Sequence, residues 1–149
     1  MTIEVINKSK NSLPEYKFQG DSGLDVRADL SDPVVIPAGK RTLIPTGLYF
    51  KLPKGYEFQV RPRSGVAIDH GITVLNSPGT IDSNYTGELK VILYNSSNWK
   101  DYTVMPGDRI AQIVLQKVPV VKWKEVSSFD EKDGEETRGA GGFGHTGIK

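Results

Sequence analysis

Short apolar runs follow one another through the first 126 residues, and Gly, Pro, Asp or Asn bounds nearly every run. Apolar and polar residues alternate clearly in 56–61 and again at Leu89, Val91 and Leu93, as in strands with one buried face. The pattern predicts strands at 2–7, 24–28, 34–36, 42–51, 57–61, 72–75, 88–94, 102–105, 110–118 and 121–126. Many short strands at this spacing predict an all-β fold: a sandwich, a jelly roll or a small barrel.

One short helix is expected among the strands, at 64–69, with Ser64 as its N-cap. Near residue 127 the chain becomes polar and acidic, and 138–147 contain five glycines, so this part has little to bury. We therefore expect a β-rich domain at 1–126 and a flexible tether with a Gly-rich C-terminal arm at 127–149. The simple interpretation of the arm is a disordered tail. The alternative is a lid over a bound nucleotide, because glycine amides and Arg138 bind phosphate and Phe143 can cover a base.

Composition excludes several classes of function. With 19 basic and 18 acidic residues the net charge is +1, which argues against a general nucleic-acid binder. The chain has no cysteine and two histidines, so thiolate catalysis is excluded and no zinc spacing is present. No signal peptide and no apolar stretch of membrane-spanning length is visible. The expectation is an intracellular, cytoplasmic protein of one domain with no membrane partner.

The richest candidate chemistry lies in 79–88, a segment with Gly, Ser and Asn between two apolar runs. Its composition predicts a hairpin or tight bend that presents Asp82 and Tyr85 from one loop. The ring can hold a flat ligand and the carboxylate can activate a water. Asn76, just before the turn, carries an amide that can read the edge of a base. Taken alone, the segment has a simpler interpretation, because Asp, Asn and Ser favour turns for backbone reasons.

Three further segments carry polar groups in suggestive places. Asp25 and Arg27 are two residues apart on one face of a strand, as a functional pair or a surface ion pair. Arg63 precedes the expected helix, whose start is a phosphate cradle or an ordinary capped turn. Gln112 interrupts an apolar run, either to contact a ligand or to face outward.

Taken in their order along the chain, the segments resemble the five signature motifs of the trimeric dUTPase family, from residue 21 to residue 147. The resemblance implies a distorted jelly-roll-like subunit and a homotrimer. It also implies hydrolysis of dUTP to dUMP and pyrophosphate with Mg²⁺. Each active site in such a trimer is shared by three chains, with the hairpin from one, the tail from another and the remaining motifs from the third.

The resemblance also implies roles for individual residues. Asp82 matches the general base that activates the water attacking the α-phosphorus, and Tyr85 matches the residue that packs on the deoxyribose. Asp25 is the carboxylate expected to hold a water of the Mg²⁺ shell. The other expected substrate-binding residues are Arg63, Ser64, Gly65 and Gln112 for phosphate, Asn76 and Gly79 for uracil, and Arg138, Phe143, Gly144, His145 and Thr146 in the tail.

One position departs from the family pattern, and two other functions share the scaffold. His145 stands where the family usually has Ser; its imidazole either donates to phosphate or points to solvent while the backbone binds, and we favour the second. A dCTP deaminase of the same fold and a non-catalytic nucleotide-responsive regulator are the alternative functions. A structural jelly-roll protein would leave the tail and the ordered motifs unexplained.

Overall fold

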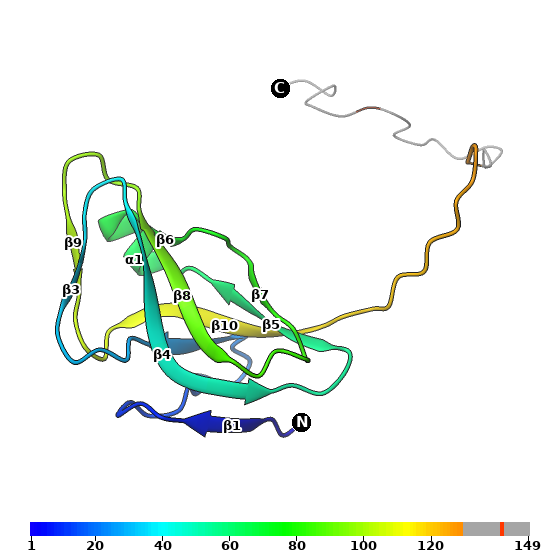
Figure 1. The fold of residues 1–149 in the computed structure, drawn as a ribbon, viewed down its shortest axis with the longest axis horizontal. Coiled ribbons are helices and arrows are strands. Elements are labelled where there is room, and N and C mark those ends of the chain that lie inside the picture. The colour runs from blue at the N-terminus through cyan, green and yellow to red at the C-terminus, as the bar shows by residue number, and fades with distance from the viewer. Residues whose placement is uncertain (130–140, 142–149) are drawn as a thin grey trace.

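The computed structural model describes residues 1–129 and residue 141. Its described part is all-β with one short helix, as expected (Figure 1). The elements are β1 Glu4–Asn7, β2 Gly23–Arg27, β3 Val34–Ile36, β4 Arg41–Lys51, β5 Tyr56–Arg61, α1 Ser64–His70, β6 Ile72–Val74, β7 Gly79–Ile81, β8 Glu88–Asn95, β9 Tyr102–Val104 and β10 Arg109–Lys117. Among these residues no helix has the length and apolar character needed to cross a membrane.

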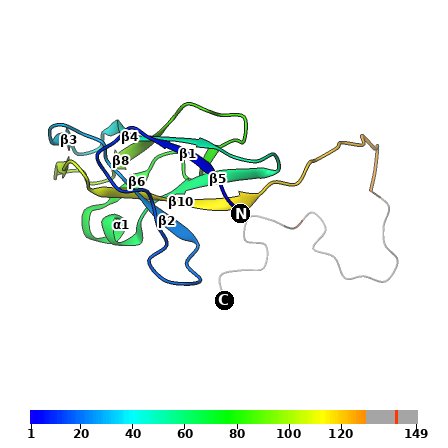
Figure 2. The ribbon, with the colours of Figure 1, turned by 90° about the horizontal axis from the view of Figure 1, so that it is seen from below.

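Two four-stranded antiparallel sheets form the body, and Figure 2 shows them as layers. The strand order is β1-β4-β8-β6 in one sheet and β2-β10-β5-β7 in the other, and β3 and β9 pair separately. Alternate side chains of the paired strands point into the space between the layers. Phe50 of β4 and Phe58 of β5 meet there edge to face, with ring centroids 5.1 Å apart. The core is therefore a jelly-roll-like sandwich, as the sequence predicted.

Core residues come from both sheets and follow the predicted alternation. On β8, Leu89, Val91 and Leu93 are buried in turn, and Asn95 ends the series with no exposed surface. The Asn95 amide donates to the carbonyl oxygens of Ile36 and Lys100, at 3.0 and 2.8 Å. A buried polar side chain that is fully hydrogen-bonded fixes the loops around it.

Two local predictions are wrong, and one short strand was not predicted. Residues 121–126 are not a strand: within the described part they extend away from the sheets, exposed, as Figure 1 shows. The N-cap of α1 is Arg63 and no side chain caps it, because Ser64 is already the first helical residue. The short strand β7 was missed because a glycine and two other residues show no alternation long enough to recognise.

The two apolar runs pair as the predicted hairpin requires, but their connection contains an additional strand. Strand β6 pairs with β8, so the apolar runs on either side of the turn are partners. Between them, however, β7 leaves for the other sheet and pairs with β5, with Gly79 opposite Val60. A Cβ at Gly79 would lie 3.3 Å from that of Val60, so glycine lets the two strands approach. The segment that carries Asp82 thus crosses from one layer to the other.

Candidate active site

The outer face of the β2-β10-β5-β7 sheet carries the first group of candidate residues. Gln112 of β10 lies opposite Asp25 on β2 and opposite Arg61 on β5. Their neighbours Val26 and Ile113 are fully buried on the inner face. Strand alternation therefore turns the polar side chains away from the core, onto one surface.

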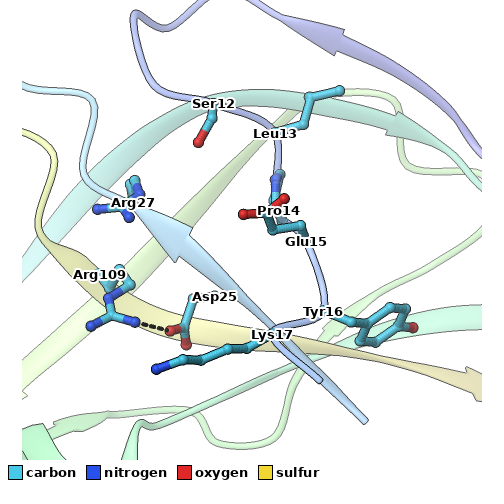
Figure 3. A pocket seen from close by; sticks show the side chains of 9 residues that line it. All are labelled: Ser12, Leu13, Pro14, Glu15, Tyr16, Lys17, Asp25, Arg27 and Arg109. Atoms are coloured by element: carbon cyan, nitrogen blue, oxygen red, sulfur yellow. Dashed lines mark hydrogen bonds and ion pairs between the residues drawn. The ribbon is translucent and has the colours of Figure 1, made fainter. Parts of the chain in front are cut away.

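Asp25 is the centre of this surface. Its Oδ1 accepts from Nε of Arg63 at 2.9 Å. Its Oδ2 accepts from a terminal nitrogen of Arg109 at 3.2 Å, as Figure 3 shows. The three side chains are 32%, 24% and 44% exposed, so the ion pairs are partly screened and their main effect is orientation. Asp25 and Arg27 do not pair with each other: Arg27 donates to the carbonyl oxygen of Gly107 at 2.8 Å.

The start of α1 adjoins this group. Arg63 also donates to the backbone carbonyl of Arg109, at 3.3 Å. Gln112 donates through Nε2 to the carbonyl oxygen of Pro62, at 2.9 Å, which ties β10 to the turn before the helix. Ser64 and Gly65 are exposed in the first turn, where helical N–H groups have no partner within the helix. The structure thus brings Asp25, Arg63, Ser64, Gly65 and Gln112 together.

Two cavities open beside Asp25 and Arg109. One, of about 570 Å³, is lined by Arg63, Gln112 and the segment from residue 15 to residue 23. The other, of about 440 Å³, lies between β2 and the residues 12–17, with Lys17 and Arg27 in its wall (Figure 3). Cavities of this size accept small ligands, and guanidinium and amide donors suit phosphate oxygens.

A second group of candidates follows β7. The Tyr85 side chain, 45% exposed, folds back over its own loop and donates to the carbonyl oxygen of Glu88 at 2.9 Å. A Cβ on Gly87 would meet the Tyr85 hydroxyl at 2.5 Å, so glycine at this position makes room for the ring. A Cβ on Gly79 would likewise lie 3.2 Å from Nδ2 of Asn76, so this side chain packs close to the glycine. Asp82 is exposed.

The two groups lie apart within one chain. Asp82 directly follows β7, whose last residue pairs with Phe58, whereas Asp25 is level with Gln112 and so with Arg61. Measured along the strand direction, Asp82 and Asp25 are therefore offset by four residues of β5. Measured across the sheet, from β7 to β2, they are three strand spacings apart. At 3.3 Å per residue and 4.8 Å per strand, their Cα atoms are about 20 Å apart. One chain thus does not bring the candidate base to the phosphate-binding group.

The tail residues lie outside the described part of the chain. This applies to Arg138, Phe143, Gly144, His145 and Thr146, and to most of the predicted arm. Their expected roles stay predictions, as does the division of the chain at residue 126.

Sequence reasoning missed Arg109. It is three residues from Gln112, and that odd spacing predicts opposite faces of a regular strand. The turn before it is visible in the sequence at Gly107, which has a φ of +82° in the structure, but no local residue pattern shows on which face Arg109 lies. Nearby, burial and the carboxylate of Asp108 raise the pKa of Tyr102, which keeps this phenol neutral well into the alkaline range.

A magnesium ion fits the donor set that is present. Among the described residues no group of three or more His, Cys, Asp or Glu is placed to hold a metal. Magnesium in nucleotide sites is held largely by substrate phosphates and waters, with few carboxylates. Both oxygens of Asp25 accept from arginine, and each retains a lone pair for a metal-bound water.

Fold and site together define a class of protein: an all-β domain with a group of arginine and amide donors suited to an anionic ligand. Comparison with known sequences gives the particular family. The sequence model of the dUTPase family matches residues 9–147. The deoxyuridine 5'-triphosphate nucleotidohydrolase of Finegoldia magna is 50% identical over 148 residues, which cover 99% of this chain and 100% of that protein. The namesake from Chlamydia pneumoniae is 51% identical over 148 residues, 99% of each.

Solved structures show the same fold. A mutant dUTPase of Staphylococcus bacteriophage 80alpha, solved with dUpNHpp, has a TM-score of 0.84 at 24% identity and covers 99% of both chains. A mutant dUTPase of S. aureus phage phi11, described with a structural Mg(II) ion, has a TM-score of 0.78 at 22% identity, over 88% of this chain and 100% of that one. The chain belongs to the dUTPase family. Three expectations from the sequence are thus confirmed: membership of this family, an enzymatic function and an all-β fold.

Proposed function

We propose that the protein hydrolyses dUTP to dUMP and pyrophosphate. Near-full-length identity of about half with deoxyuridine 5'-triphosphate nucleotidohydrolases supports this function. The observation that carries it is the donor group around Asp25, where Arg63, Gln112 and the first turn of α1 converge beside a cavity of about 570 Å³. These donors match the needs of a triphosphate chain.

In the proposed reaction Asp82 is the general base. Its carboxylate accepts a proton from a water whose oxygen attacks the α-phosphorus. The new P–O bond forms as the bond from the α-phosphorus to the bridging oxygen breaks, and pyrophosphate leaves with that oxygen. Arg63, Ser64, Gly65 and Gln112 hold the phosphates in line. A magnesium ion, with Asp25 accepting from one of its waters, would neutralise charge on the triphosphate.

Sugar and base recognition belong to the segment around β7. Tyr85 is placed on a loop held by its own hydroxyl bond, so its ring can pack on a deoxyribose and leave no room for a 2′-hydroxyl. Asn76 and the backbone at Gly79 would read uracil. A close backbone there would reject the 5-methyl group of thymine by steric conflict.

We also propose that the active site is shared within a homotrimer. The spacing of the strands fixes the separation between Asp82 and Asp25 at about 20 Å. This distance is too long for both residues of one chain to serve the same triphosphate site. If the loop after β7 of one copy lies on the donor group around Asp25 of another copy, Asp82 comes close to the phosphates. Exposed apolar residues after β10, such as Trp123 at 94%, support burial by a partner copy.

The tail completes the proposed site, with Arg138 on the terminal phosphates and Phe143 over the uracil. Residues 1–126 form the β-rich hydrolase domain and 127–149 the tether and lid. In this proposal the backbone of the tail binds phosphate, Gly144 and Thr146 included, while His145 points to solvent. A nucleotide substrate also implies that the enzyme works inside the cell.

Parallel assays of dUTP, dCTP, dTTP and UTP test this function. We expect pyrophosphate release with Mg²⁺ from dUTP alone. Ammonia from dCTP would show instead the deaminase that shares this scaffold. Binding of dUTP with no turnover of any nucleotide would indicate a regulator and refute the proposed hydrolysis.

A further inference from the structure

Arg109 reaches the outer face of its sheet through a β-bulge. Strand β10 pairs Arg109 with Arg27 and then shifts its register against β2 by one residue, so that Ile110 is the extra residue. Ile110 and Ala111 are both buried, although neighbours in a regular strand point to opposite faces. The bulge therefore places Arg109 on the same face as Gln112, in spite of their odd spacing.

An ion pair with Asp25 fixes the direction of the Arg109 side chain, and a second ion pair holds Asp25 itself. The Oδ2 of Asp25 accepts from a terminal nitrogen of Arg109, while Oδ1 of the same carboxylate accepts from Arg63. The turn before Arg109 is held as well, because Arg27 donates to the Gly107 carbonyl. A guanidinium has five N–H donors, and within the described residues the Arg109 side chain donates to Asp25 alone. Donors thus remain for a ligand.

Arg109 lines two cavities that also have Arg63 in their walls: the one of about 570 Å³ and a third, smaller one. It shares the cavity of about 570 Å³ with Gln112, and a cavity of about 320 Å³ with Gly65 at the start of α1. Any anion held by Arg63 and Gln112 therefore lies beside Arg109. With the Arg109 side chain 44% exposed, a ligand can reach the guanidinium without a change in the fold.

We propose that Arg109 is a phosphate-binding residue of the nucleotide site, positioned by the bulge at Ile110 and by the carboxylate of Asp25. The inference rests on the proposed function and adds a cation to the group that holds the triphosphate. A planar guanidinium binds phosphate oxygens in pairs, which a lysine does not reproduce. Because negative charge moves onto pyrophosphate as the α-phosphorus bond breaks, such a cation also favours its departure.

Calorimetric titration with inorganic tripolyphosphate and with dUMP tests this role without turnover. We expect Arg109→Gln to weaken tripolyphosphate binding by about 10- to 100-fold, as for a lost hydrogen bond to a charged group. Binding of dUMP should change by less than twofold, and Arg109→Lys should restore only part of the loss. The matched control is Arg41→Gln, at the exposed first residue of β4, which should bind both ligands as wild type does.

Other results would overturn the inference. Wild-type affinity for tripolyphosphate in Arg109→Gln would remove Arg109 from the site. Equal losses for tripolyphosphate and dUMP, in either Arg109 variant, would show a structural role only. Failure of the proposed function is separate: a wild-type protein that binds tripolyphosphate through Arg109 but leaves dUTP intact would refute hydrolysis and retain the phosphate contact.

Discussion

Replacing Gly23 by alanine should disable Gln112 while leaving the fold almost unchanged. A Cβ at Gly23 would lie 2.0 Å from Oε1 of Gln112 and 3.0 Å from its Cδ. The obstacle is the end of a flexible side chain, so the amide moves and the backbone stays. Its bond to the Pro62 carbonyl, 2.9 Å long, is then lost.

The magnitude follows from these contacts. The lost bond costs about 0.5–1.5 kcal/mol of unfolding free energy. Reduced freedom of the unfolded chain on changing glycine to alanine returns about 0.4–1 kcal/mol. Net stability should therefore change by less than about 1 kcal/mol. An amide contact to a charged phosphate is worth about 1.5–3 kcal/mol, so kcat/KM for dUTP should fall by about 10- to 100-fold.

Pyrophosphate release and urea unfolding measure the two quantities on the same preparation. Gly23→Ala and Gln112→Ala should have equal effects on kcat/KM, and the double variant should be no worse than either. Gln116→Ala, on the same strand, is the control and should hydrolyse dUTP normally. Multiplied losses in the double variant, or full activity in Gly23→Ala, would refute the reasoning.

Three further predictions concern the core, the alkaline limit and the tail. Asn95→Leu leaves the buried carbonyl of Ile36 and the partly buried carbonyl of Lys100 without their side-chain donor. It should lower the free energy of unfolding by about 3–5 kcal/mol in urea, against less than about 0.5 kcal/mol for the exposed control Asn98→Leu. Because the pKa of Tyr102 is raised in the folded state, its contribution to stability is complete below about pH 10 and is lost as pH rises through the folded pKa. The free energy of unfolding should therefore fall less between pH 9 and 11 for Tyr102→Phe than for wild type. Deleting 127–149 should abolish most dUTP hydrolysis and leave the melting temperature nearly unchanged, since β10 ends at Lys117.

Each of these predictions has a contrary result. A leucine at position 95 as stable as wild type would mean that its neighbours find other donors. Identical alkaline slopes for wild type and Tyr102→Phe would mean that the phenol is not perturbed by its surroundings. Normal hydrolysis after the truncation would remove the lid from the proposed site.

The sequence predicts most strands of this fold because short alternating runs ended by Gly and Pro carry their own boundaries. Strand 34–36 matches β3 at both ends. Strand β7 escaped prediction, since its partner β5 is chosen by close packing of Gly79 on Val60, a contact between distant segments. A strand at 121–126 failed for the opposite reason: its residues alternate, but no other described segment of the chain covers them.

For the site, the sequence gives the types of the candidate residues, and the structure shows on which face of the sheet each one lies. Strand alternation places Asp25 and Arg27 on one face, but only the pairing of β10 with β2 shows that Gln112 shares the face of Asp25. Arg109 could not be placed from the sequence, because a bulge reverses the alternation and no local residue pattern announces it. The distance between Asp82 and Asp25 depends on the order β2-β10-β5-β7, which a single sequence does not specify.

Mixing two inactive variants tests most directly whether the site is shared between chains. Asp82→Asn lacks the proposed base and Arg63→Gln lacks the proposed phosphate ligand, so each alone should be inactive. If the β7 loop and the donor group of a site come from different chains, random reassembly of equal amounts restores roughly a quarter of the sites. We expect about that fraction of wild-type pyrophosphate release after unfolding and refolding the mixture. Mixed oligomers, verified by native mass spectrometry, that release no pyrophosphate would contradict a site built from more than one chain.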